Sequence, residues 1–182
     1  MRLFVAIALP DAIAQTLSML QSGVPGARWQ TREQMHLTLR FIGEADGNQA
    51  QAIDDALSAI DAPVFELQLK GVGEFGGRNP RALWAGVAAN EALAHLQRKI
   101  ETALQRIALP AEERKFTPHV TLARLKAAPR GRVMDFLVHH ALYASAAFPV
   151  GEFTLFSSHL SPNGSLYRVE RSYPLRSDGP RP

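Results

Sequence analysis

Hydrophobic and polar residues alternate with a period of two in a series of short segments, and apolar residues recur at helical spacing between most of them. The alternation predicts strands at residues 2–9, 35–42, 64–70, 81–87, 118–125, 152–158 and 166–173. The helical spacing predicts helices that begin at 10–11 and at 46–48, and helices over 90–107 and about 131–142. Strands and helices therefore alternate along the chain.

The order strand–helix–strand–helix–strand occurs twice, on either side of a glycine-rich segment, Gly71 to Pro80, that we expect to be a loop. The first strand of each half carries a similar sequence, since Arg2-Leu3-Phe4-Val5-Ala6 matches Arg81-Ala82-Leu83-Trp84-Ala85. A repeat with a period of roughly 80 residues is too long for a solenoid. It predicts two interleaved lobes, roughly 1–70 and 81–160, that face each other across a pseudo-twofold axis and share a cleft.

The composition suits one folded domain over residues 1–175, since 46% of the 182 residues are hydrophobic and 20% are charged. The segment 176–182 is polar and rich in proline, and we expect a flexible tail there. Absence of cysteine excludes disulfides and a cysteine nucleophile, and it fits a cytoplasmic protein. The first apolar run ends at Pro10, too early for a secretion signal, and no apolar stretch has the length that a bilayer requires. We therefore expect no membrane association.

The sequence His-x-Thr-Leu occurs at 36–39 and again at 119–122, in the same slot of the two halves. On a strand, residues i and i+2 point to the same face, so each motif projects one imidazole and one hydroxyl together. The intervening Leu37 or Val120 then packs into the core. Two such strands related by a pseudo-twofold axis would present two histidines and two threonines around one point.

This arrangement suits a tetrahedral anion. The hydroxyls can donate to non-bridging phosphate oxygens, while a neutral histidine accepts a proton and a protonated one donates it. A single histidine in an alternating strand is more often a packed core residue, but two at equivalent positions favour a function. Zinc would need at least a third ligand, and none stands nearby in the sequence, so we expect no metal. The net charge of +3 and pI of 9.6 are compatible with a phosphate-bearing substrate without identifying one.

From Arg2 to about Leu175 the chain resembles the two-histidine phosphoesterases, specifically the RNA 2′,3′-cyclic phosphodiesterases once named 2′-5′ RNA ligases. The segments that carry the resemblance are 2–7, 9–10, 36–43, 83–86 and 116–124. It implies a bilobal α+β fold in which each lobe is an antiparallel sheet flanked by helices, with the catalytic cleft between them. It also implies hydrolysis of terminal RNA 2′,3′-cyclic phosphates to 2′-phosphates without a cofactor, a reaction that the same site could reverse to make 2′-5′ linkages.

By the same resemblance, His36 is the proton donor, His119 is the proton acceptor, and Thr38 and Thr121 hold the phosphate. Strict alternation places Arg40 on the face of Thr38, where it would bind phosphate or end the strand in solvent. Alternation points Arg124 away from His119 unless a bulge turns it inward. The resemblance favours a phosphate-binding role for Arg124.

Several alternatives remain open. Phe4 and Trp84 occupy matching positions, where they would stack on a base or, more simply, pack in the core. We assign no role to the other histidines, His95, His139, His140 and His159. The partner we expect is RNA or an oligonucleotide with a cyclic phosphate end, bound by a monomer. The rival functions are a phosphodiesterase for a small cyclic nucleotide and a non-catalytic RNA-binding module.

Overall fold

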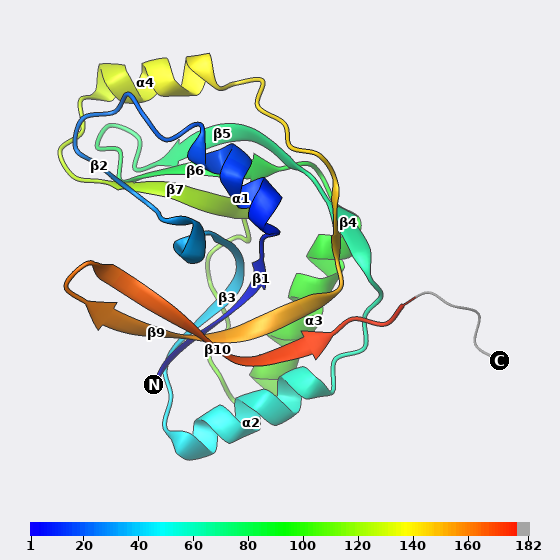
Figure 1. Ribbon diagram of the computed structural model, residues 1–182. Coiled ribbons are helices and arrows are strands. Elements are labelled where there is room, and N and C mark those ends of the chain that lie inside the picture. The colour runs from blue at the N-terminus through cyan, green and yellow to red at the C-terminus, as the bar shows by residue number, and fades with distance from the viewer. Residues whose placement is uncertain (178–182) are drawn as a thin grey trace.

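The computed structural model describes residues 1–177 as an α+β fold built on antiparallel sheets (Figure 1). The strands are β1 (Arg2–Ala8), β2 (Ala27–Trp29), β3 (His36–Glu44), β4 (Phe65–Leu67), β5 (Leu69–Phe75), β6 (Ala82–Val87), β7 (His119–Leu125), β8 (Phe148–Val150), β9 (Glu152–Ser161) and β10 (Gly164–Pro174). The helices are α1 (Asp11–Ser18), α2 (Gly47–Ser58), α3 (Glu91–Arg106), α4 (Arg130–His139) and the 3₁₀ helix η1 (Arg32–Gln34). The predicted α+β class is confirmed.

The main sheet consists of two halves that meet at one position. Its order is β10-β9-β1-β3-β7-β6-β5, with β2 also paired to β7, while β4 and β8 form a separate two-stranded sheet. Within the described residues, β3 and β7 pair at a single position, Leu37 opposite Val120. These are the middle residues of the two His-x-Thr motifs, so the motifs lie at the junction of the halves.

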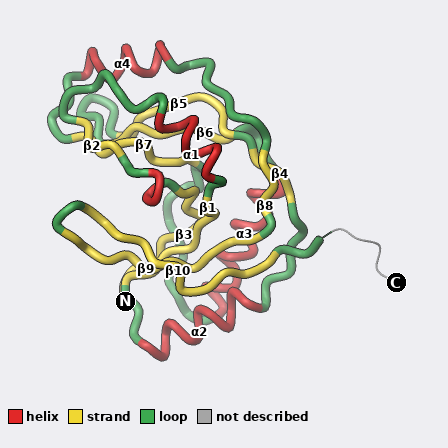
Figure 2. The backbone as a smooth tube through the Cα atoms, in the orientation of Figure 1, coloured by secondary structure: helices red, strands yellow, loops and turns green. Residues whose placement is uncertain are grey.

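The two halves exchange elements along the chain (Figures 1 and 2). Strands β9 and β10 return from the C-terminal part of the chain to pair beside β1. Helix α3 follows β6 but packs with α2 and against β3, in the other half. Helix α1 follows β1 yet hydrogen-bonds, through Thr16, to Tyr143 in the segment after α4. The halves are therefore interleaved in sequence.

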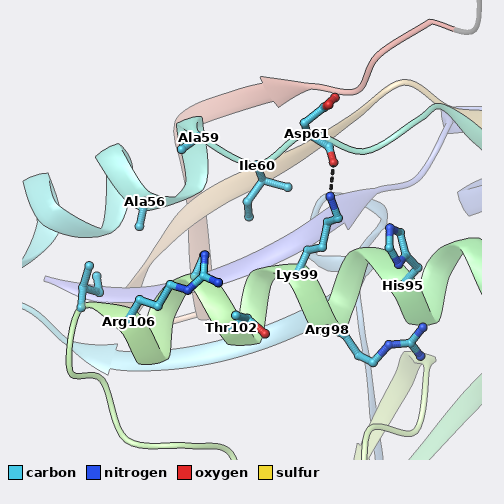
Figure 3. Close-up of a pocket in the computed structure, with 11 residues that line it drawn as sticks. Ala56, Ala59, Ile60, Asp61, His95, Arg98, Lys99, Thr102 and Arg106 are labelled. Atoms are coloured by element: carbon cyan, nitrogen blue, oxygen red, sulfur yellow. Dashed lines mark hydrogen bonds between the residues drawn. The ribbon is translucent and has the colours of Figure 1, made fainter.

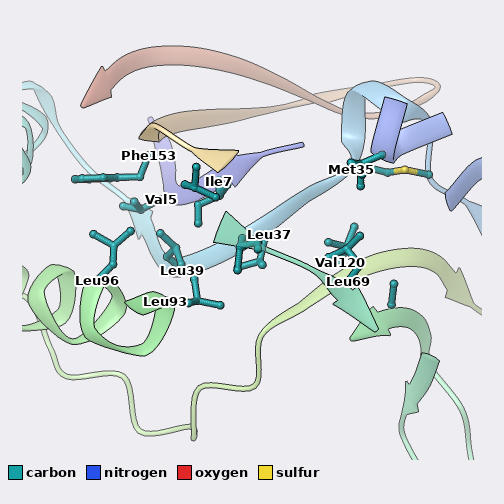
Figure 4. Close-up of a cluster of buried hydrophobic side chains, with 14 of the residues drawn as sticks. Val5, Ile7, Met35, Leu37, Leu39, Leu69, Leu93, Leu96, Val120 and Phe153 are labelled. Atoms are coloured by element: carbon teal, nitrogen blue, oxygen red, sulfur yellow. The ribbon is translucent and has the colours of Figure 1, made fainter. Parts of the chain in front are cut away.

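One apolar core lies beneath the junction (Figure 4). Leu37 and Val120 are both fully buried, as the alternation predicted. Leu93 and Leu96 project from α3 into the same cluster as Leu37, which is how α3 is held against the first half. Burial of this kind is the main source of stability in a fold without disulfides.

The expected loop at 71–80 is wrong in its first half, because β5 continues to Phe75. The glycines that suggested a loop serve the strand instead. A Cβ atom at Gly73 would lie 2.2 Å from a carbon of the Trp84 ring and would overlap it. The close packing of that ring therefore requires glycine at position 73. Gly71 has a φ of +71° where the β5–β6 register shifts, a conformation that glycine adopts without strain. The predicted strand at 64–70 is likewise broken into β4 and β5, and β2, β8 and η1 were too short for their pattern to predict.

The expected tail at 176–182 is wrong at its first residue. Arg176 pairs with Pro63 as an isolated bridge, and its guanidinium lies 2.6 Å from Asp61. Residues 178–182 lie outside the described part of the chain, as does that part of the prediction. No helix among the described residues is long and apolar enough to cross a membrane.

We expect Leu37→Ala to lower the free energy of unfolding by about 2–5 kcal/mol, because it leaves a cavity at the junction of the two halves. Leu142→Ala is the matched control, since Leu142 is 98% exposed, and we expect a change within about 0.5 kcal/mol. Urea denaturation followed by circular dichroism measures both. Equal destabilisation of the two variants would contradict the central place given to Leu37.

Candidate active site

The junction between the halves brings the two histidines and the two threonines together. Continuing the antiparallel register from the central pair places His36 beside Thr121 and Thr38 beside His119. The charge of His119 acts on the pKa of His36, which agrees with this proximity. All four side chains are half-buried. The structure therefore places the four residues at one site.

Each imidazole is anchored to a backbone group two residues before it. The Nδ1 atom of His119 lies 2.6 Å from the carbonyl oxygen of Thr117, and His36 hydrogen-bonds the backbone of Gln34. Because a carbonyl can only accept, Nδ1 of His119 carries the hydrogen. The Nε2 atom of His119 is then left to accept a proton from a reactant or to return one.

Aromatic rings surround both histidines. The ring of His36 lies 4.8 Å from Phe4 and 5.0 Å, edge-on, from Tyr167. The ring of His119 lies 4.9 Å, edge-on, from Phe75 and 6.0 Å from Trp84. Phe4 and Trp84 thus occupy equivalent places beside the two histidines and lie outside the main apolar cluster. Stacking of either ring on a base stays a prediction. Sequence reasoning missed Tyr167 and Phe75, because a lone aromatic residue on a distant strand has no motif.

Burial keeps both histidines neutral near pH 7. It lowers the pKa of His36 to about 4, and the nearby charges of His119 and Arg124 contribute to the lowering. Burial also lowers the pKa of His119, again with a contribution from Arg124. A bound phosphate anion would raise both values, since it favours the charged imidazole.

The two threonine hydroxyls are available to a ligand. Within residues 1–177, neither Thr38 nor Thr121 donates or accepts a side-chain hydrogen bond in the protein. Both follow their histidine by two residues on the same strand face. They are suited to donate to oxygens of a group held between the histidines.

A β-bulge follows each motif and changes which side chains face the site. The pairing of β1 with β3 skips Leu39, and the pairing of β6 with β7 skips Leu122. A bulge turns two successive side chains to the same face, so the alternation after it is reversed. Arg40, two residues after Thr38, consequently faces the back of the sheet. Arg124, three residues after Thr121, faces the site.

The predicted phosphate role of Arg40 is therefore wrong. Arg40 is 8% exposed, and its Nε lies 2.5 Å from Oε2 of Glu101 on α3. Its terminal nitrogens donate to the carbonyls of Phe41 and Pro110. The guanidinium ties β3 to α3 and the segment after it, behind the sheet.

Arg124, in contrast to Arg40, lies on the face of the sheet that carries the histidines. It is exposed, and its charge lowers the pKa of both His36 and His119. Within residues 1–177 it has no carboxylate within ion-pair distance. The bulge at Leu122 turns the side chain of Arg124 toward the histidines. The role of Arg124 in binding phosphate stays a prediction.

Other polar features lie away from this site. A groove of about 750 Å³ between α2 and α3 is lined by Arg98, Lys99 and Arg106, and Lys99 donates to the carbonyl of Asp61 (Figure 3). None of the four motif residues lines that groove. Among the described residues, no group of three or more histidine, cysteine, aspartate or glutamate side chains is placed to hold a metal ion.

Comparison with known proteins identifies the family. The sequence model of the 2′-5′ RNA ligase superfamily matches residues 9–161. A Thermotoga maritima protein named RNA 2′,3′-cyclic phosphodiesterase is 32% identical, over 93% of this chain and 92% of its own length. A Thermus thermophilus protein of the same name is 31% identical, over 98% and 92%. The chain belongs to the 2′-5′ RNA ligase superfamily, and the resemblance drawn from its motifs is confirmed.

Solved structures agree with this assignment. A crystal structure of a Thermus thermophilus protein superposes with a TM-score of 0.80 at 28% identity, covering 98% of this chain and 100% of the other. The structure of Escherichia coli LigT complexed with 3′-AMP superposes with a TM-score of 0.79 at 25% identity, covering 96% and 97%. The bilobal fold is therefore shared across nearly the whole length of these proteins.

We expect the burial of His36 to make the protein less stable as the pH falls. The pKa of His36 is about 4 in the folded protein against 6.5 ordinarily, so the unfolded chain takes up a proton first. Between pH 7 and pH 4.5 this costs about 2 kcal/mol of the free energy of unfolding. His36→Gln cannot titrate, so urea denaturation at the two pH values should show a loss smaller by that amount. His95→Gln, which removes an exposed histidine of α3, is the control. A wild-type loss no larger than that of His36→Gln would refute the burial argument.

Proposed function

We propose that this protein hydrolyses terminal RNA 2′,3′-cyclic phosphates to 2′-phosphomonoesters, by metal-independent acid–base catalysis with His36 and His119. The observation that carries the proposal is the single pairing of Leu37 with Val120, which sets the two His-x-Thr motifs antiparallel around one point. The names of the Thermotoga and Thermus relatives support the same activity.

The proposed reaction needs only proton transfer and positioning. The Nε2 atom of His119 accepts a proton from water as the water oxygen bonds to phosphorus. The bond from phosphorus to the 3′ oxygen breaks, and His36 donates a proton to that oxygen. The product carries a 2′-phosphate and a 3′-hydroxyl, and proton exchange with solvent restores both histidines. Thr38 and Thr121 donate to the non-bridging oxygens, and Arg124 balances their charge.

The assignment of donor and acceptor depends on the substrate. In the free protein the pKa of about 4 suits His36 to the role of base. A cyclic phosphate carries a negative charge into the buried site and raises the pKa of both histidines, which is what a donor at neutral pH requires. The assignment of His36 as donor rests on the resemblance to the family. We further propose that the protein acts as a cytoplasmic monomer on RNA or oligonucleotides, and that the site can run in reverse to form 2′-5′ linkages.

An oligoribonucleotide ending in a 2′,3′-cyclic phosphate, incubated with the protein and EDTA, tests the proposal. We expect a 2′-phosphate end, assigned by phosphorus NMR, and a loss of kcat of about 10²- to 10⁴-fold in both His36→Ala and His119→Ala. His95→Ala, in the groove between α2 and α3 that no motif residue lines, should retain the wild-type rate. No product from folded wild-type protein would sink the assignment and favour a small cyclic nucleotide as substrate. Binding of the oligonucleotide without turnover would favour a binding module.

Substitution of Arg40 should affect mainly the stability of the protein, and substitution of Arg124 should affect mainly its activity. We expect Arg40→Ala to lower the free energy of unfolding by about 3–5 kcal/mol, because it leaves Glu101 half-buried without its partner. Arg124→Ala should leave the unfolding free energy within about 0.5 kcal/mol of wild type and lower kcat/KM by about 10-fold or more. Urea denaturation and the cyclic phosphate assay measure the two effects. An Arg40 variant that stays stable but loses turnover would reverse these roles.

A further inference from the structure

Arg28, on β2, stands directly opposite Arg124 on β7. The two are partners in the antiparallel register, so their side chains leave the same face of the sheet. Both are exposed. The charge of Arg124 reaches both histidines, so the face that the two arginines share is the face of the active site.

The pair is an unfavourable one for the protein alone. Like charges directly opposite on neighbouring strands destabilise a sheet. Among the described residues, neither Arg28 nor Arg124 has a carboxylate within ion-pair distance, whereas Arg40, Arg98, Arg171 and Arg176 each have one. Two opposed guanidinium groups without acidic partners are suited to an anionic ligand.

Arg124 is the arginine whose charge acts on the pKa of both histidines. The guanidinium of Arg28 points instead to the tip of the β9–β10 hairpin, where its Nη2 atom would lie 3.2 Å from a Cβ at Gly164. Gln34 ties the same tip to η1 by donating to the carbonyl of Ser165. In Figure 1 the hairpin and β2 lie on the same side of the molecule. Arg28 therefore lies at the rim of the site, beside the tip of the hairpin.

We propose that Arg28 binds the phosphodiester on the 5′ side of the terminal nucleoside, one phosphate upstream of the cyclic phosphate. The inference rests on the proposed function and narrows its substrate to a dinucleotide or longer RNA. Arg124 and Arg28 then serve consecutive phosphates, one at the histidines and one at the rim. A planar guanidinium can donate to two non-bridging oxygens of such a diester at once.

The test compares two substrates that differ in this phosphate. One is a dinucleotide ending in a 2′,3′-cyclic phosphate, and the other is the matching nucleoside 2′,3′-cyclic monophosphate. We expect Arg28→Ala to lower the ratio of kcat/KM for the dinucleotide to kcat/KM for the mononucleotide by about 10- to 100-fold, the value of one charge-assisted hydrogen-bonding group. Arg28→Lys should recover part of the ratio. Arg106→Ala removes the same charge behind the sheet and should leave the ratio unchanged.

A ratio that stays at the wild-type value in Arg28→Ala, or that falls equally in Arg106→Ala, would overturn the inference. Inactivity of wild type on both substrates would overturn the proposed function separately. The affinities for the two 2′-phosphate products, measured by calorimetry, decide on Arg28 without turnover. A preference of wild type for the dinucleotide product that Arg28→Ala abolishes supports the subsite, and equal affinities in wild type refute it.

Discussion

The hydrogen-bonded contact between β3 and β7, at Leu37 and Val120, is the constraint on which the site depends. Both side chains are fully buried, so neither strand can slip by one residue without turning an apolar side chain to the cleft and a histidine to the core. The same register that packs the core therefore sets the positions of His36 and His119. Stability of the junction and geometry of the site are two results of one pairing.

Burial of the site also changes the protonation of its two histidines. Two imidazoles held among aromatic rings lose the solvation that a protonated form needs, and the pKa of each falls. Arg124 adds a positive charge to the same space. The free protein thus holds one guanidinium beside two neutral imidazoles, and no carboxylate of the described chain lies within ion-pair distance of Arg124. A phosphate anion pairs with this positive charge, which gives the proposed substrate a favourable interaction that a neutral ligand lacks.

The sequence predicts the parts of this arrangement that follow from period and repetition. Alternation placed each histidine and threonine on one face, and the repeated motif implied two facing halves. Alternation alone gave the wrong face of the sheet for both Arg40 and Arg124. One extra residue in each strand reverses the face of the side chains after it, and this bulge leaves no mark in the hydrophobic pattern. The sequence could not identify Arg28, because the partner that makes this arginine informative lies on a strand far along the chain. The surroundings of Arg40, Arg124 and Arg28 depend on their positions in the sheet, which only the tertiary structure reveals.

The exchange of elements between the halves has a consequence for how the molecule comes to be made. Strand β1 is synthesised first, but its pairing partner β9 begins at Glu152. A chain emerging from a ribosome therefore keeps one edge of β1 open until β9 has been translated. Closing so long a loop makes folding slow relative to a fold of local contacts. Tyr167, which lies against His36, arrives later still. The candidate site is thus complete only after β10 has been translated, and a nascent chain that already carries both motifs still lacks the ring of Tyr167 beside His36.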